Sequence, residues 1–222
     1  MGFIKHVMGW NASKPFKKTA SQSRKPDMPF GFTVGSHVSI NAALILQFEG
    51  ETDIVVPDDS QIMAIGTLDI GSNCRLIRCH LDNEHYFVQF LMNGPRASDI
   101  ESLILFGYHE VRTLNSPDER ARLMGPGSKI GMPYYELEHV EYVRQWGTED
   151  GQTEMAALTE NVITAEQSYA IGHRCVLYAR HLNLAYRREF LLLSFETDEP
   201  GNQSLTTAVG VTLQLSDISI SH

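Results

Sequence analysis

From Phe30 onward the chain alternates between short apolar runs and clusters of Gly, Asn, Asp and Pro. Apolar runs bounded by such turn residues are typical of β-strands. Asp82-Asn83 predicts a hairpin turn, and a run that is apolar throughout, such as residues 103–106, suits a strand covered on both faces. The strands predicted by this pattern are 37–40, 43–48, 62–70, 74–81, 85–92 and 103–111, followed by 134–137, 140–146, 169–171, 175–182, 190–195 and 206–218.

A short helix is predicted between these two groups of strands. Ser116 is a good N-cap, Pro117 suits the first helical position, and Asp118-Glu119 complement the helix dipole. Gly125 is a stop signal. The stretch that follows the helix, Gly125-Pro126-Gly127, is interpreted as a linker.

The two groups of strands resemble each other in sequence. Residues 70–81 and 171–182 share six of twelve residues at an offset of 101 positions. Similarity at a fixed spacing indicates a duplicated structural unit. A single β domain without a true repeat is the alternative.

The expected fold is therefore mainly β with minor α. It consists of two tandem, pseudo-duplicated antiparallel β-units, sandwich-like or barrel-like, that pack together. Residues 1–29 are predicted to be a flexible basic leader, residues 30–124 the first β-unit and residues 125–222 the second. The pattern leaves open whether the units fold independently or share one sheet.

Charge is distributed unevenly along the chain. The formal net charge is −9, yet residues 1–28 carry six basic side chains and one acidic one. The acidic remainder argues against nucleic acid as a partner, because phosphate binding needs a basic face. The basic leader suits weak peripheral contact of residues 1–28 with an anionic membrane, although a solvated arm is the simpler interpretation.

The three cysteines are not spaced like a disulfide framework, which indicates reduced thiols and a cytoplasmic location. A location at the periphery of the inner membrane is the alternative. Cys74, His80, Cys175 and His181 together have the composition of a zinc site. However, Cys and His six positions apart on an extended strand lie roughly 20 Å apart, so neither a metal nor another cofactor is expected. Three carboxylate pairs lie in turn-like, polar segments where solvent would surround them: Asp58-Asp59, Asp118-Glu119 and Glu149-Asp150. No catalytic residues are predicted.

Several segments resemble a known family. They are Gly35-Ser36, Phe48-Glu49-Gly50-Glu51, Gly66 with Asp69-Ile70-Gly71-Ser72, Arg75-Leu76 with Arg78, Arg188-Glu189-Phe190-Leu191-Leu192-Leu193-Ser194, and Val209-Gly210-Val211 with Leu213. In these segments the chain resembles the YjfK-like family of uncharacterised bacterial proteins, which carry a domain of unknown function. The resemblance implies a bacterial cytoplasmic protein linked to membrane-stress functions, and it brings no catalytic residues.

Two functions are compatible with the sequence. The first is a non-enzymatic interaction or adaptor protein that binds an unidentified protein partner, because no convergent set of polar residues is visible. The second is a small-ligand-binding protein or enzyme with its site in the cleft between the β-units. Arg78, Tyr178 and Arg180 are the candidate lining of that cleft.

Overall fold

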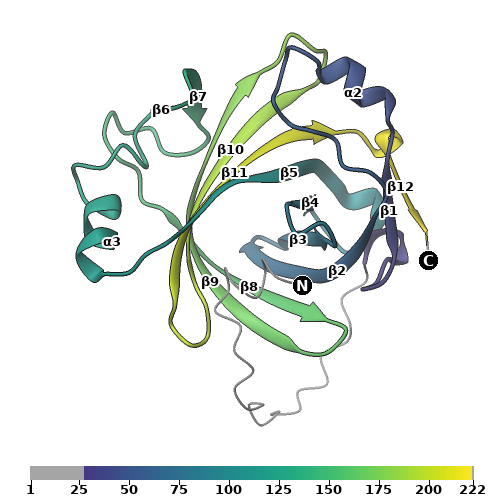
Figure 1. Cartoon of the computed structure of the whole chain (residues 1–222), viewed down its shortest axis with the longest axis horizontal. Coiled ribbons are helices and arrows are strands. Elements are labelled where there is room, and N and C mark those ends of the chain that lie inside the picture. Colours follow the sequence, from purple (N-terminus) through teal and green to yellow (C-terminus); the bar gives the residue numbers. More distant parts are fainter. Residues whose placement is uncertain (1–27, 222) are drawn as a thin grey trace.

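Eight antiparallel strands close into a barrel, in the order β2-β3-β4-β5-β11-β10-β9-β8 and back to β2 (Figure 1). The structure is a computed structural model that describes residues 28–221. The barrel strands are β2 (Ser60–Gly71), β3 (Cys74–Leu81), β4 (Tyr86–Met92), β5 (Ile100–Thr113), β8 (Ala156–Thr164), β9 (Ser168–His181), β10 (Arg188–Thr197) and β11 (Gln203–Leu213). The mainly β fold predicted from the sequence is confirmed.

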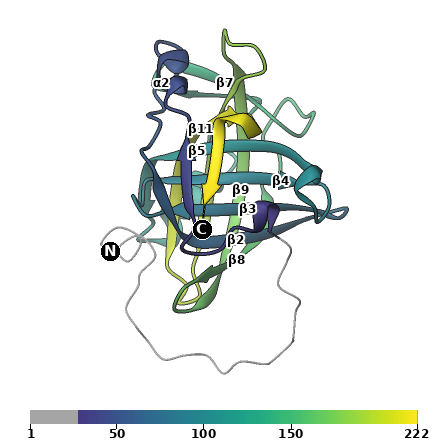
Figure 2. The same ribbon diagram turned by 90° about the vertical axis from the view of Figure 1, so that its right-hand side faces the viewer.

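Both halves of the chain build this one barrel. Strands β2–β5 come from the first half and β8–β11 from the second, and the halves join where β5 pairs with β11 and β2 pairs with β8 (Figure 2). The two predicted units therefore share one sheet. The duplication and the boundary at residue 124 stay predictions. Locally, residues 70–81 turn from β2 into β3, whereas residues 171–181 run straight along β9.

The strands are strongly staggered around the barrel. A path along paired residues that starts at Ser168 on β9 and passes once around the barrel returns to β9 at Arg180, twelve positions further on. At a fixed number of strands a larger stagger means more tilt and a wider barrel. A strand spacing of ~4.8 Å and a rise of ~3.3 Å per residue give a backbone radius of roughly 9 Å. The β-barrel of the TIM fold, with a stagger of about eight, is narrower.

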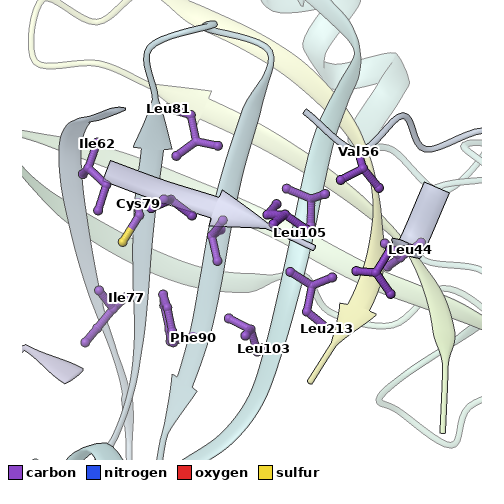
Figure 3. Close-up of a cluster of buried hydrophobic side chains, with 14 of the residues drawn as sticks. Leu44, Val56, Ile62, Ile77, Cys79, Leu81, Phe90, Leu103, Leu105 and Leu213 are labelled. Atoms are coloured by element: carbon purple, nitrogen blue, oxygen red, sulfur yellow. The ribbon is translucent and has the colours of Figure 1, made fainter. Parts of the chain in front are cut away.

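Additional elements cover the outside of the barrel. On one side lie β1 (His37–Ile40), α2 (Ala43–Phe48) and β12 (Ile218–Ser221), and on the other α3 (Pro117–Met124), β6 (Tyr134–Leu137) and β7 (Val140–Arg144). Single-turn 3-10 helices span Pro29–Gly31, Ala97–Asp99 and Leu215–Asp217. The largest apolar cluster joins the outer face of β2–β5 and β11 to Leu44, Val56 and their neighbours (Figure 3). The outer faces of these five strands are therefore largely buried as well as their inner faces.

The prediction of a strand at residues 43–48 is wrong, because this segment is the helix α2. Its residues are almost all apolar, and periodicity alone does not separate a short buried strand from a short buried helix. In the folded chain Leu44 and Phe48 lie one helical turn apart and are both buried, while the intervening Leu46 is exposed. The Asn41 side chain accepts a hydrogen bond from the Ala43 amide, at 3.0 Å.

Several boundaries also differ from the prediction. Strand β8 was not predicted, β9 is one continuous strand rather than two, and the predicted strand 206–218 is divided between β11 and β12. The predicted helix is confirmed as α3, where the Ser116 side chain accepts a hydrogen bond from the Glu119 amide. Among the described residues, no helix is both long and hydrophobic enough to cross a bilayer. The predictions for residues 1–27 of the leader lie outside the described residues.

Candidate functional site

Polar side chains from both halves of the chain converge inside the barrel. Side chains alternate between the two faces of a strand, and paired residues on neighbouring strands share a face. The register therefore places one polar set on the inner face, and we call it the interior polar cluster. Its members are Arg78, His80, Gln89, Tyr108, Glu160, His173, Ser194, Glu196 and Thr206.

Glu160 is the centre of this cluster. Arg78 Nη1 donates a hydrogen bond to Glu160 Oε2 at 2.8 Å, and His80 Nε2 lies 2.9 Å from Glu160 Oε1. His173 Nε2 approaches Glu160 Oε2 to 3.0 Å. Arg78 Nε also donates to Gln89 Oε1 at 2.9 Å. The Glu160 side chain is only 1% exposed, so these neighbours replace water around its carboxylate.

Gly66 makes this arrangement sterically feasible. It lies on β2, the strand between Arg78 on β3 and Glu160 on β8. A Cβ at Gly66 would lie 1.7 Å from Glu160 Oε1. The missing side chain therefore lets the Glu160 carboxylate lie over β2 and reach Arg78.

The electrostatics of the pair favour its charged form. Burial acts to raise the pKa of Glu160, but the Arg78 charge and the side chains of His173 and His80 outweigh it, and the pKa lies well below its ordinary value. For Arg78, burial acts to lower the pKa, but the Glu160 charge outweighs it and the pKa is raised. Arg78 and Glu160 are therefore an ion pair at neutral pH.

A second part of the cluster lies around His173. Its Nδ1 atom lies 3.0 Å from Ser194 Oγ and 3.7 Å from Glu196 Oε1. Thr206 is the strand partner of Ser194 and is also buried. Burial and the nearby Glu196 and Glu160 carboxylates raise the pKa of Tyr108, so its phenol stays protonated at neutral pH.

Two buried atoms of the cluster have no hydrogen-bond partner among the described residues. They are Thr206 Oγ1 and His173 Nε2, the latter lying at an ion-pair distance from Glu160 without hydrogen-bond geometry. A buried polar group without a partner costs about 1–3 kcal/mol. Such atoms in a native interior normally bond to water or to a ligand. The cluster therefore retains hydrogen-bonding capacity that the chain itself does not use.

Apolar side chains occupy the rest of the interior. The buried members are Phe87, Ile104, Phe106, Cys175, Leu192 and Ala208. Ala156, Leu158, Leu177 and Phe190 pack against them from the same inner face but are only partly buried. These inward-facing apolar side chains are thus partly accessible to solvent, next to a polar cluster that is mostly buried. This combination is typical of ligand sites, which are mostly apolar with a few placed polar groups.

The structure does not bring the three predicted site residues together. Arg78 lies in the interior polar cluster, whereas Tyr178 and Arg180 lie on the outer face of β9. The Tyr178 hydroxyl accepts a hydrogen bond from the Gly131 amide at 2.7 Å, within the apolar packing under β6 and β7.

Arg180 belongs to a second buried cluster, on the outside of the barrel. Its Nε atom donates to Glu189, which also accepts hydrogen bonds from the hydroxyls of Tyr142 and Thr52. Arg180 Nη2 donates to the Glu51 carbonyl at 2.7 Å. Arg180 and Glu189 are paired on the neighbouring barrel strands β9 and β10, whereas Thr52 follows α2 and Tyr142 lies on β7. The cluster therefore attaches the segment after α2, and also β7, to the barrel.

The four residues with the composition of a zinc site are spread over the barrel. His80 and Cys175 are buried inside it, Cys74 is partly exposed beside the β2–β3 turn, and His181 is exposed at the end of β9. Within residues 28–221, no group of three or more His, Cys, Asp or Glu side chains has an arrangement that could hold a metal ion. The three cysteines form no disulfide.

Sequence reasoning missed Glu160 and His173 as site residues. Glu160 lies in β8, where consecutive polar residues Thr159-Glu160-Asn161 interrupt the alternation and look like a loop. The one signal was the spacing of Leu158, Glu160 and Val162, with Glu160 at an otherwise apolar position. A charged residue on an apolar face indicates a buried partner, but only the barrel register identifies that partner as Arg78.

Comparison with known proteins adds a family but no activity. No curated protein and no solved structure matches the chain. Residues 13–219 match the family model described as protein of unknown function (DUF2491). Since this match extends over most of the sequence, the chain belongs to the DUF2491 family of proteins of unknown function.

Proposed function

We propose that this protein is a non-enzymatic binding protein that holds a small ligand inside the barrel, between the two predicted β-units. The observation that carries the proposal is the buried Thr206 Oγ1 atom in the interior polar cluster, which has no hydrogen-bond partner among the described residues. The barrel around this cluster has a larger radius than the β-barrel of the TIM fold, whose interior is filled by side chains. Partly exposed apolar side chains such as Leu177 and Phe190 border the same interior.

The contacts within the cluster support binding rather than catalysis. The Glu160 carboxylate already has three neighbours, and the Arg78 guanidinium contacts both Glu160 and Gln89. Burial raises the pKa of the interior thiol Cys175, which keeps it a poor nucleophile. These groups therefore build a fixed polar surface for a ligand.

A neighbouring pair of alanines on β8 offers a direct test. Ala156 faces the interior, while Ala157 faces outward and is exposed. The neutral apolar dye Nile red should gain fluorescence with the full chain. Ala156→Trp should abolish most of this gain because the indole fills the interior, and Ala157→Trp should leave it intact. Equal binding by both variants, or no binding by the parent chain, would argue against the interior site.

A second candidate, an adaptor that binds a protein partner, is favoured by exposed apolar residues at one end of the barrel. Ile45 and Leu46 on α2 are 54% and 77% exposed, and Tyr186, between β9 and β10, is 88% exposed. The two segments are neighbours, because Asn183 donates its amide hydrogen to Glu51 at 2.9 Å. We call Ile45, Leu46 and Tyr186 the end patch.

The resemblance to YjfK-like proteins supports a bacterial cytoplasmic setting near membrane-stress proteins for such an adaptor. Binding partners recovered from a bacterial lysate should be lost with Leu46→Glu and with Tyr186→Glu. They should be retained with Ile163→Glu, an exposed apolar position on β8 away from the end patch. Recovery of the same proteins by all variants would remove the adaptor hypothesis.

A further inference from the structure

The chemistry of the interior polar cluster restricts the ligand that the barrel accepts. We infer, building on the proposed function, that the ligand is an amphipathic small molecule with an apolar body and a hydrogen-bond-donating head, either a hydroxyl or an ammonium group, and that the interior polar cluster excludes a carboxylate or phosphate head. The inference rests on which charges in the cluster are already paired and on which acceptors remain.

An anion entering the cluster would meet no free cation. The one guanidinium, Arg78, contacts Glu160 at 2.8 Å and Gln89 at 2.9 Å. The cluster contains two carboxylates, those of Glu160 and Glu196, against this single guanidinium. Taking an anionic head out of water without a paired cation costs several kcal/mol. A ligand carboxylate would therefore add a third buried negative charge.

The interior polar cluster offers hydrogen-bond acceptors rather than free cations to a ligand. Glu196 Oε1 lies 3.7 Å from His173 Nδ1, beyond hydrogen-bond reach, and its side chain is 17% exposed. Thr206 lies on β11 beside Ser194 on β10, and the Thr206 hydroxyl is among the atoms without a partner. A hydroxyl or ammonium head could donate to the Thr206 oxygen and to the Glu196 carboxylate. An ammonium head would in addition balance the charge of Glu196.

Arg188 does not change this balance. It also lies on an inner-face position of β10, with its guanidinium 5.2 Å from the centre of the Phe190 ring. Eight positions separate it from Glu196 along β10, a span of roughly 26 Å in an extended strand. Arg188 thus lies toward the opposite end of the interior and leaves the carboxylates of the cluster unneutralised. Its Nη2 atom donates to Gln145 Oε1 at 2.6 Å, and its buried Nε atom has no partner among the described residues. An anionic head could therefore meet this guanidinium only far from the interior polar cluster.

Three probes of equal chain length test the head group. Isothermal titration of the full chain with hexylammonium, hexanol and hexanoate near pH 7 should show binding of the first two at least tenfold tighter than binding of hexanoate. Hexanoate binding as tight as either of the others would overturn the inferred ligand class while leaving the interior site in place. If none of the three probes binds and the chain also fails to bind Nile red, both the proposed ligand-binding function and the inferred ligand class are contradicted.

Variants of the two acceptors sharpen this test. Thr206→Val keeps the shape of the side chain and should weaken hexanol and hexylammonium binding by about 2–10-fold, which corresponds to the net contribution of one hydrogen bond. Glu196→Gln should weaken hexylammonium by about tenfold or more and hexanol far less, because only the ammonium loses a charge partner. The control is Thr207→Val, a buried threonine on the outer face of the same strand. Equal losses in Thr206→Val and Thr207→Val would contradict the inference.

Discussion

Arg78 and Glu160 form an ion pair across the barrel interior, with 2.8 Å between Nη1 and Oε2, although β2 lies between their strands. The two residues come from different halves of the chain. Both side chains are almost completely buried, so the pair connects the two halves within a single core. Pairs of this kind add little net stability relative to an apolar core, but the loss of one partner leaves a buried charge alone.

Removing the negative charge should therefore destabilise the protein strongly. Glu160→Gln keeps the size of the side chain but leaves Arg78 buried without a carboxylate, and we expect a loss of about 3–5 kcal/mol in the free energy of unfolding. Thermal and urea unfolding measure it. Glu101→Gln, at an exposed position on β5, should cost less than about 0.5 kcal/mol. A similarly small effect at Glu160 would mean that the pair is not buried as described.

The Gly66 position should not tolerate even one methyl group. Gly66→Ala places a Cβ 1.7 Å from Glu160 Oε1, so the carboxylate must move away from Arg78 and His80. We expect a loss of at least about 1–3 kcal/mol, as for other overpacked sites. In Gly172→Ala the nearest atom to the new Cβ is the Thr197 carbonyl oxygen, at 3.8 Å, so this strand glycine is the control. Equal unfolding midpoints for the two variants would contradict the close approach.

The lowered pKa of Glu160 implies a specific acid sensitivity. A carboxyl group whose pKa is lower in the folded state stabilises the fold above its unfolded pKa, about 4.3, and this contribution is lost as pH falls below that value toward the folded pKa. The stability difference between the wild type and Glu160→Gln should thus be constant from pH 7 to about pH 5 and shrink at lower pH. Urea titrations across this range measure it, and a difference that grows with acidification would reverse the assigned direction.

The helical form of residues 43–48 predicts opposite results at two nearby leucines. Leu44 is 1% exposed and belongs to the outer apolar cluster, whereas Leu46 is 77% exposed. Leu44→Ala should lower the free energy of unfolding by about 2–5 kcal/mol, and Leu46→Ala should change it by less than about 0.5 kcal/mol. In the strand that the sequence pattern predicted, residues 44 and 46 would share one face. Comparable losses at both positions would favour that strand over α2.

Local signals were sufficient for several elements. Strands β1, β3 and β6 have the predicted bounds, and for β3 the turn residues Gly71-Ser72-Asn73 mark where the strand begins. Ser72 and Asn73 both adopt positive φ, as a two-residue hairpin turn requires. The cap at Ser116 likewise identified α3. In each case the interactions that define the element lie within a few residues along the chain.

Interactions between segments distant in the chain decided the form of residues 43–48 and the placement of the candidate site residues. The segment 43–48 is apolar enough for either a strand or a helix, and packing of Leu44 and Phe48 against the barrel selects the helix. Of the three residues proposed for a cleft, only Arg78 faces the interior, because the register places Tyr178 and Arg180 on the opposite face of β9.

The sequence by itself determined a mainly β chain with short strands, a capped helix and an acidic composition, because these features depend on neighbouring residues and on residue content. Only the tertiary structure decided that β5 pairs with β11 and β2 with β8, and hence that Arg78, Glu160 and His173 meet in one interior. Arg78 and Glu160 are 82 residues apart in the chain, and barrel closure and stagger, which no local pattern encodes, bring their side chains together.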